Sequence, residues 1–310
     1  MKKEGPSLVQ MTRAPFLSSI IAPLITGTLL CMKINGDLNI PGFILVLVTG
    51  IALHVATNVY NDIYDTIQGT DKVNVQRNEF SGGSGVLQNY PELMGKMYFI
   101  ARMGLLTALC STIGLMFFVD KDLWIYLWGL YIISAFFSKY YTAAPVKLAY
   151  RGLGEISVWF SFGPMAIFIA ALSQNIVFDY QVLMLMPLSG LSTLSILLIG
   201  QMIDIDADRE GGKHGVASRL GTRMTASIYI AVQLGIIANV LCVLVFFTGN
   251  AMPLMLSLIP YAIIFPVAAL AVLKYHSNPS ELKRAAKMTV QIHMLFSVLL
   301  IAGFVIYNFI

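Results

Sequence analysis

Residues 41–65 read PGFILVLVTGIALHVATNVYNDIYD, and this stretch decides the kind of fold. Its apolar part is long enough to cross a lipid bilayer as a helix, which needs about 20 residues. The run ends in Asn58, Asn61, Asp62 and Asp65, so amide and acidic side chains follow the apolar residues without a break. An apolar run of this length indicates a membrane-spanning helix, and its acidic end then lies at the membrane boundary.

The composition of the whole chain agrees with this interpretation. Of its 310 residues, 57% are hydrophobic and 12% are charged, and the mean hydropathy is +0.76. Soluble domains carry about 25% charged residues, so the composition argues against a water-soluble enzyme. The high hydrophobicity also argues against a disordered chain. The three cysteines lie in apolar stretches without pairing or metal-ligand spacing, so we expect them to be inert.

Nine stretches are apolar and long enough to span a bilayer. They indicate helices, because the strands of membrane barrels are about 10 residues long and alternate strictly. We therefore predict an all-α integral membrane protein, with residues 1–310 as a single domain of nine transmembrane helices around a central cavity. The predicted spans are residues 15–34, 41–61, 97–118, 123–143, 153–173, 181–203, 224–248, 252–273 and 288–308.

The basic residues segregate when the loops between nine spans alternate across the membrane. Of the 20 Lys and Arg residues, only Lys33 and Lys121 fall on one side, and all the others fall on the opposite side. Cytoplasmic loops are enriched in Lys and Arg. We therefore expect a multi-pass protein of the cell membrane with a cytoplasmic amino end, an external carboxyl end, and its active site on the cytoplasmic side.

The first acidic motif closes the second predicted span. If that helix continues to about residue 66, Asn58, Asp62 and Asp65 share one face, and His54 lies one turn earlier on the same face. A single acidic helix end is usually just solvated, so this motif alone is ambiguous.

The second acidic motif, DIDADR at residues 204–209, closes the sixth span in the same way. Gln201, Asp204 and Asp208 share a helix face there. Crowded carboxylates repel one another unless a cation lies between them, and Mg²⁺ is bound by one or two carboxylates with waters and substrate phosphates. Two such ends, both continuing into the membrane as amide-containing faces, favour a functional site.

Basic residues near the motifs are candidates for holding phosphate oxygens. Each alone is more often a topology signal, and Lys72 and Lys213 have the strongest claim because each closely follows an acidic motif. The other candidates are Arg77 and Arg209, with Arg13 and Lys139 as weaker ones. Together these groups predict a membrane enzyme for a lipid diphosphate, with a dry, aromatic-lined pocket for an allylic cation.

The two motifs resemble those of the UbiA superfamily of intramembrane prenyltransferases. NDIYD at residues 61–65 is similar to the first Asp-rich motif, and DIDADREGGK at residues 204–213 is similar to the second. The resemblance covers nearly the whole chain. It implies that four aspartates are catalytic and hold Mg²⁺ through the diphosphate, namely Asp62, Asp65, Asp204 and Asp208. Asn58 or Asn61 would lie beside them.

Within that superfamily the chain is most similar to the 1,4-dihydroxy-2-naphthoate prenyltransferases of menaquinone synthesis. This similarity lies in YTAAP at residues 141–145, LAYRGLGE at 148–155 and FGP at 162–164. It implies Mg²⁺ as the cofactor, a polyprenyl diphosphate donor, and an aromatic acceptor whose carboxylate leaves as CO₂. The residues expected to contact substrate are Asn58, Asn61, Lys72, Arg77, Tyr141, Arg209 and Lys213.

Other interpretations stay open. A UbiA-type enzyme with another acceptor, such as homogentisate, 4-hydroxybenzoate, haem or glycerol phosphate, has the same motifs. A secondary transporter also pairs polar groups on membrane helices, but its site lies near the midplane. We expect the lipid bilayer and the substrates as partners, and no nucleic acid. His54 is interpreted first as a hydrogen-bonded core residue, and Glu155 as a cap on its own helix or a contact for the acceptor.

Overall fold

The computed structural model describes residues 5–74 and 83–310, and in this part of the chain helices and turns occur without any strand. Eight helical segments within it are long and apolar enough to cross a membrane. A further helix, α7 (Trp124–Tyr140), has 17 residues and occupies the fourth predicted span. The predicted all-α membrane bundle is confirmed, and among the described residues eight of the nine predicted spans are long and apolar enough to cross a membrane.

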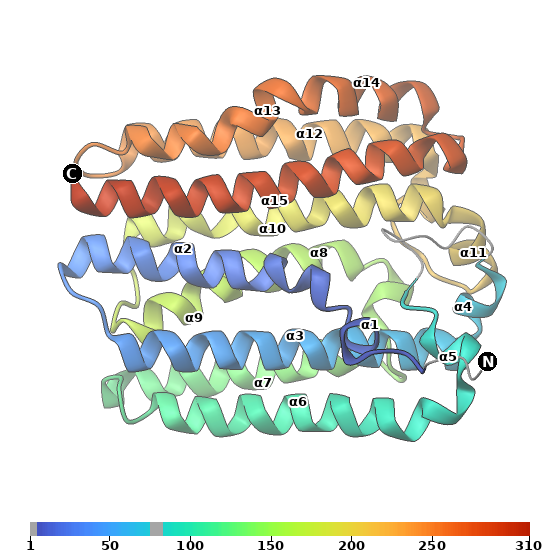
Figure 1. Cartoon of the computed structure of the whole chain (residues 1–310), viewed down its shortest axis with the longest axis horizontal. Coiled ribbons are helices and arrows are strands. Elements are labelled where there is room, and N and C mark those ends of the chain that lie inside the picture. The colour runs from blue at the N-terminus through green and yellow to red at the C-terminus, as the bar shows by residue number, and fades with distance from the viewer. Residues whose placement is uncertain (1–4, 75–82) are drawn as a thin grey trace.

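The other predicted spans correspond to one or more helices each. They are α2 (Ser18–Asn35), α3 (Ile40–Gln68), α6 (Met94–Leu115), α8 (Gly154–Phe160) with α9 (Ala166–Ser173), α10 (Tyr180–Ile203), α12 (Val216–Phe246), α13 (Ile259–Ile263) with α14 (Phe265–Tyr275), and α15 (Pro279–Phe309). Figure 1 shows these helices running side by side along the long axis of the molecule.

Short helices gather at one end of the bundle. These are α1 (Leu8–Thr12), α4 (Thr70–Val73), α5 (Val86–Asn89) and α11 (Ile205–Glu210). Figure 1 shows α4, α5 and α11 together at that end, and the carboxyl end of the chain at the opposite one. At the end that bears the short helices, α3, α12 and α15 all extend beyond their predicted apolar spans. Hydropathy detects only the apolar part of a helix, whereas good helix formers such as those of residues 281–287 continue it.

The loops at the opposite end are joined by polar contacts. Asn39 Nδ2 donates to the Phe118 carbonyl oxygen at 2.7 Å, and the Asp120 N–H donates to Asn175 Oδ1 at 2.9 Å. Lys33 Nζ lies 4.8 Å from the centroid of the Tyr307 ring, which is close to the carboxyl end. The loops predicted to lie on the side of the membrane with few Lys and Arg residues are therefore neighbours in the structure.

The fifth span carries a π turn at Ser161–Met165, which includes Pro164. Proline cannot donate to the helical ladder, and a π turn accommodates the missing bond. There the backbone approaches α10 closely. A Cβ on Gly163 would lie 2.5 Å from the Met186 carbonyl oxygen, and a Cβ on Gly190 would overlap the Trp159 carbonyl oxygen. Small residues of this kind allow two membrane helices to pack at backbone contact.

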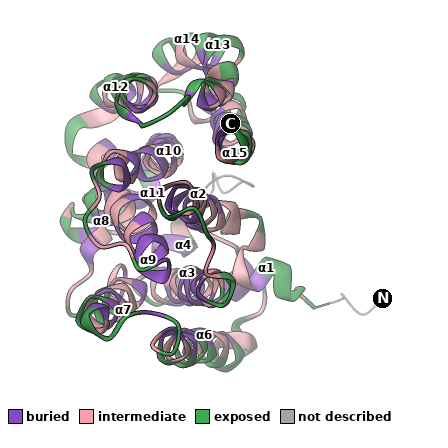
Figure 2. Ribbon diagram, turned by 90° about the vertical axis from the view of Figure 1, so that its left-hand side faces the viewer, coloured by how far each residue is buried: buried purple, intermediate pink, exposed green. Residues whose placement is uncertain are grey.

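Apolar side chains cover much of the outside of the bundle. Figure 2 shows exposed faces on the peripheral helices α6, α7, α12 and α14, and buried faces between the helices. Phe99 is 64% exposed, Phe117 80% and Val245 74%. A soluble protein rarely exposes so much apolar surface, whereas a bilayer covers it.

Candidate active site

The first acidic motif lies on the last turns of α3, which continues as helix to Gln68. Asn58, Asn61 and Asp65 line one cavity. Asp62 does not line it: this residue is 2% exposed, and its Oδ1 accepts a hydrogen bond from the Ser84 N–H at 3.2 Å. Each helical step turns the side chain by about 100°, so Asp62 lies about 60° around the helix from Asp65. The predicted shared face therefore has Asp62 at its edge, turned toward a different neighbour.

Asp62 and Asp71 converge on Gly83. This glycine has φ +70, and a Cβ on it would lie 3.1 Å from Asp62 Oδ1 and 3.2 Å from Asp71 Oδ2. Asp71 lines the cavity and accepts a hydrogen bond from Gln88 Nε2 at 3.1 Å. Within the described residues, Asp62 Oδ2 is buried without a hydrogen-bond partner. A buried carboxylate oxygen without a donor is costly, so a cation or a donor is expected to satisfy it.

The second acidic motif bends at Asp204. α10 ends at Ile203 and α11 begins at Ile205, so Gln201 and Asp208 lie on different helices rather than on one continuous face. Nevertheless Gln201, Asp204 and Asp208 all line the same cavity as Asp65. The bend changes the predicted local geometry but keeps the predicted grouping.

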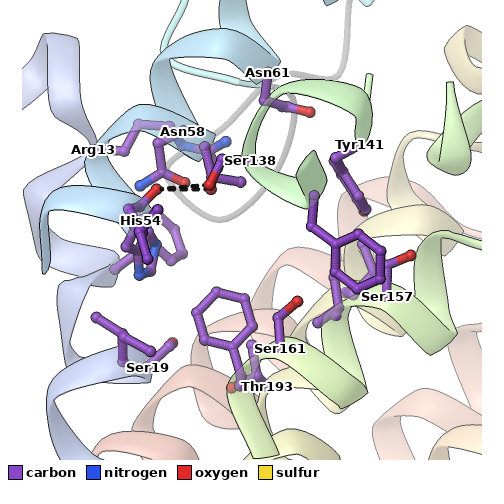
Figure 3. Close-up of a pocket in the computed structure, with 18 of the residues that line it drawn as sticks. Arg13, Ser19, His54, Asn58, Asn61, Ser138, Tyr141, Ser157, Ser161 and Thr193 are labelled. Carbon is purple, nitrogen blue, oxygen red and sulfur yellow. Dashed lines mark hydrogen bonds between the residues drawn. The ribbon is translucent and has the colours of Figure 1, made fainter. Parts of the chain in front are cut away.

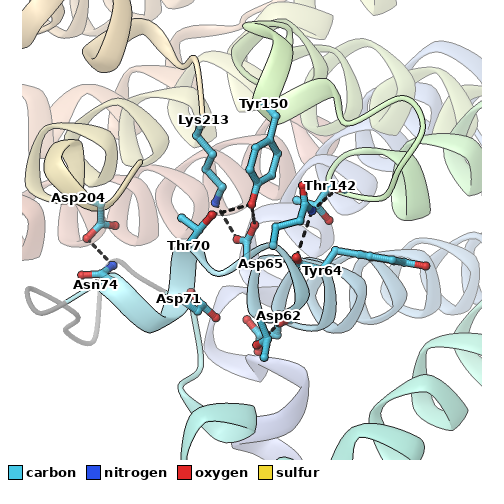
Figure 4. A network of polar contacts seen from close by, with 12 residues as sticks. Asp62, Tyr64, Asp65, Thr70, Asp71, Asn74, Thr142, Tyr150, Asp204 and Lys213 are labelled. Carbon is cyan, nitrogen blue, oxygen red and sulfur yellow. Dashed lines mark hydrogen bonds and ion pairs between the residues drawn. The ribbon is translucent and has the colours of Figure 1, made fainter. Parts of the chain in front are cut away.

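Side chains from the two motifs bond directly to each other. Lys213 Nζ lies 2.7 Å from Asp65 Oδ2, and Asn74 Nδ2 donates to Asp204 Oδ1 at 3.0 Å. Tyr150 donates its hydroxyl proton to Asp65 Oδ1 at 2.7 Å and lies 2.8 Å from Thr70 Oγ1. Figure 4 shows Lys213 and Tyr150 reaching from one side toward Asp65 on α3. The two acidic motifs are thus joined by a network of direct contacts.

The charges of this network shift the pKa values of its groups outside the membrane spans. Burial raises the pKa of Asp208 to about 7, with Lys213 opposing the shift and the neighbouring carboxylates Asp204, Asp65 and Glu155 adding to it. Burial lowers the pKa of Lys213, but the carboxylates of Asp65 and Asp208 outweigh it and raise that pKa well above its usual value. Lys213 is therefore a permanent cation among carboxylates.

The donor set suits a divalent cation shared with a phosphate ligand. Carboxylates of Asp65, Asp71, Asp204 and Asp208 line one cavity, and Asp62 adds an oxygen that has no hydrogen-bond partner among the described residues. Among the described residues, no three His, Cys, Asp or Glu side chains form a ready-made metal cage. Mg²⁺ is usually held by one or two carboxylates plus waters and substrate phosphates, so these residues fit it.

The cavity passes from this charged mouth into an apolar interior. Its volume is about 320 Å³, and its deep walls include Leu24, Leu130, Met165, Ile169 and Ile196. Polar side chains lie between the two regions. Figure 3 shows Arg13, His54 and Asn58 on one side of the cavity, and Tyr141, Ser157 and Ser161 across from them. The cavity can therefore hold a ligand with a charged head and an apolar body.

His54 lies at the boundary between these regions. It is buried, its ring lies edge-on to Phe162 at 5.1 Å, and its Nδ1 has no hydrogen-bond partner among the described residues. The expectation of a hydrogen-bonded core histidine is not met at Nδ1. The aromatic rings of Phe137, Tyr141 and Phe162 also line the cavity, as expected of an aromatic-lined pocket.

The predicted substrate-binding cations divide into two groups. Lys213 lines the cavity. The uncharged residues that were expected to contact substrate, Tyr141, Asn58 and Asn61, line it as well. Lys72 and Arg209 are exposed and outside its lining, and Arg209 Nη2 lies 3.5 Å from the Ser218 carbonyl oxygen. Their contact with substrate therefore stays a prediction, which the cavity lining does not support. Arg77 lies outside the described residues.

Sequence reasoning missed four residues of the network. Asp71 lies six residues after the first motif and was not assigned to the site. Thr70, Asn74 and Tyr150 carried no local signal, since their partners include residues 80 to 130 positions away. Their hydrogen bonds form only because the fold brings these distant parts of the chain together.

Comparisons with known proteins agree with the fold and with the motifs. The sequence profile of the UbiA prenyltransferase family matches residues 100–299. The chain is 24% identical to a 2-carboxy-1,4-naphthoquinone phytyltransferase of Synechocystis, over 97% of this chain and 96% of the relative. It is 25% identical to a 1,4-dihydroxy-2-naphthoate octaprenyltransferase of Bacillus subtilis, over 98% and 94%.

Solved structures share the same fold. A UbiA homologue from Aeropyrum pernix without ligand superposes with a TM-score of 0.64 at 14% identity, covering 96% of this chain and 98% of that one. A UbiA homologue from Archaeoglobus fulgidus, bound to DMAPP and Mg²⁺, superposes with a TM-score of 0.56 at 12% identity, covering 94% and 98%. The resemblance noted in the sequence is thereby confirmed over nearly the full length.

Proposed function

Because this chain belongs to the UbiA prenyltransferase family, we propose that it transfers a polyprenyl group from a polyprenyl diphosphate to 1,4-dihydroxy-2-naphthoate, with Mg²⁺ as cofactor. The chain is a prenyltransferase, which removes the transporter alternative. The acceptor, the metal and the orientation in the membrane are the parts that we propose.

One observation carries the proposal: both acidic motifs and an apolar interior line a single cavity. A diphosphate would lie at the carboxylate mouth and its prenyl chain in the apolar part, since the two ends of the donor need opposite surroundings. Several relatives named for naphthoate prenyl transfer, including those from Synechocystis and Bacillus subtilis, match this chain over most of its length. The names of these relatives support 1,4-dihydroxy-2-naphthoate as the proposed acceptor.

The site residues divide the chemical work. Asp62, Asp65, Asp71, Asp204 and Asp208 would hold Mg²⁺ with the diphosphate. When bound, the metal supplies positive charge that stabilises the departing diphosphate. Lys213 adds a second positive charge from the protein, in a place where water is largely excluded.

The cavity interior serves the prenyl cation and the acceptor. The bond between the prenyl C1 and the diphosphate oxygen breaks, and C1 joins the ring carbon that bears the carboxylate. That carboxylate leaves as CO₂, and its electron pair restores the aromatic ring. Faces of Phe137, Tyr141 and Phe162 stabilise positive charge by cation–π interaction, and the apolar walls keep water from capturing it.

We also propose that the acidic mouth faces the cytoplasm. All Lys and Arg except Lys33 and Lys121 belong to the side of the membrane on which the mouth lies. The enzyme would then be a multi-pass protein of the cell membrane that meets a soluble acceptor from inside the cell.

A parallel transfer assay tests the proposed acceptor. Purified protein with Mg²⁺ and geranylgeranyl diphosphate receives dihydroxynaphthoate, 4-hydroxybenzoate or homogentisate, and products are identified by mass spectrometry. We expect a prenylated naphthalenediol only with the first acceptor, and none with EDTA. A product only with another ring would overturn the acceptor and keep the prenyl transfer.

A further inference from the structure

The amino end of α12 is capped by side chains from two other helices. Helix starts leave N–H groups without partners in their own helix, and a cap residue normally accepts from them. The cap position of α12 is Gly215, which has no side chain to do so. Instead Glu155 Oε1 accepts from the Val216 N–H at 2.6 Å, and Gln201 Oε1 accepts from the Ala217 N–H at 3.4 Å.

The two capping side chains also hold each other. Gln201 Nε2 donates to the same Glu155 Oε1 at 2.8 Å, so that one oxygen accepts two hydrogen bonds. Glu155 lies in the first turn of α8 and is 8% exposed, and Gln201 lies in the last turn of α10. α8 has no side-chain cap of its own, which corrects the expectation that Glu155 caps its own helix. One buried carboxylate therefore ties α8, α10 and α12 together.

The fit of Gly215 shows how tightly this junction is built. A Cβ on Gly215 would lie 2.6 Å from Gln201 Nε2 and 2.8 Å from its Cδ. The amide of Gln201 cannot simply swing away, because Glu155 and Ala217 hold its two ends. Any other residue at position 215 would therefore disturb the cap.

The junction lies two residues after Lys213. The Lys213 N–H donates to the Asp208 carbonyl oxygen at 2.7 Å, which anchors the turn to α11 on one side. The Glu155 and Gln201 cap anchors it on the other side, and between these anchors Lys213 Nζ lies 2.7 Å from Asp65 Oδ2. The direction in which the Lys213 side chain points thus depends on the cap made by Glu155 and Gln201, which do not bond to Lys213.

We infer that Glu155 and Gln201 are positioning residues that set Lys213 against the diphosphate. The inference rests on the proposed function, since it assigns Lys213 to the donor. Glu155 acts through the start of α12 rather than by touching the acceptor, which distinguishes it from the acceptor contact considered from the sequence.

Donor binding measured without any acceptor tests the inference. Equilibrium binding of labelled geranylgeranyl diphosphate in Mg²⁺ is compared for wild type and Glu155→Ala. We expect the Kd to rise about tenfold, the effect of losing one buried hydrogen-bond acceptor. Glu155→Gln keeps an oxygen at the same place and should recover most of the affinity. In turnover, the donor KM should rise while the acceptor KM stays unchanged.

A matched control uses Asp179, the carboxylate that caps the amino end of α10. Asp179 Oδ1 accepts from the Gln181 N–H at 2.7 Å, at the end of α10 far from the site. Asp179→Ala removes a cap of the same kind, so stability should fall while the donor Kd stays unchanged. An equal rise in Kd for both variants would mean a general structural effect and would overturn the inference.

A double-mutant cycle tests whether the effect passes through Lys213. In a Lys213→Met background, Glu155→Ala should change the donor Kd by less than about twofold, since the group being positioned is gone. Full additivity would overturn the inference. If Glu155→Ala does not fold, Gln201→Leu takes its place in the cycle with the same expectation. Absence of Mg²⁺-dependent donor binding in wild type would instead refute the proposed function.

Discussion

Lys213 is expected to act as an internal counter-ion that a divalent cation can replace. Its Nζ lies 2.7 Å from Asp65 Oδ2, and the two side chains are 18% and 4% exposed. Removing one partner of a buried pair costs about 3–5 kcal/mol, because it leaves the other charge without compensation. Since Lys213 keeps some exposure, we expect Lys213→Met to lower the free energy of unfolding by about 3 kcal/mol, the low end of that range.

The assay is thermal unfolding of the purified protein in detergent, with and without Mg²⁺. A cation that binds the uncompensated carboxylates stabilises the folded state by mass action. Mg²⁺ should therefore stabilise Lys213→Met more than it stabilises wild type. The control is Lys274→Met, since Lys274 is exposed and lies 5.0 Å from the centroid of the Tyr275 ring, much as Lys213 lies 5.4 Å from that of Tyr150. Two results would contradict this role of Lys213: unchanged stability of Lys213→Met, or an equal stabilisation of Lys213→Met and wild type by Mg²⁺.

Three further predictions concern the acidic mouth and the helix packing. Asp65→Ala should lower kcat by at least about 100-fold while the protein remains in the membrane, whereas Asp206→Ala, which changes an exposed neighbour in the second motif, should be near normal in the same assay. Because burial raises the pKa of Asp208 to about 7, a proton competes with Mg²⁺ below that pH. The Mg²⁺-dependent affinity for the donor should then fall by up to about tenfold per pH unit below 7 and level off above it, and Asp208→Asn should flatten the profile in a binding titration. Gly190→Ala should destabilise the protein by about 1–3 kcal/mol because a Cβ there overlaps a carbonyl oxygen of α8, while Gly129→Ala, with nothing within 4 Å, should not destabilise it in a thermal melt.

The spans and the two motifs were predictable because their signals are local. The stretch of residues 41–61 contains no Asp, Glu, Lys or Arg, and the acidic residues that follow it fall on a helix face by periodicity alone. Fold class, span order and the grouping of Asp65 with Asp204 and Asp208 follow from such signals and from the resemblance that they carry. Each of these features depends on residues that lie close together in the sequence.

The geometry that connects the motifs was not predictable, because its contacts are distant in sequence. Lys213 and Asp65 are separated by 148 positions, and Glu155 and Val216 by 61. The bend at Asp204 replaces a continuous face with two helices, and the outward turn of Arg209 follows from it. A motif can therefore indicate a metal site while leaving open which of its charged residues point into the cavity.

The proposed transfer releases the ring carboxylate as CO₂, and the ratio of CO₂ to prenylated product tests this step. The protein, with Mg²⁺ and a polyprenyl diphosphate, is given dihydroxynaphthoate labelled in its carboxyl carbon, and both labelled CO₂ and prenylated product are quantified. We expect one CO₂ for each prenylated ring, and neither product with Asp65→Ala. A prenylated ring that retains the labelled carboxylate, or an unreacted naphthoate beside an intact donor, would contradict it.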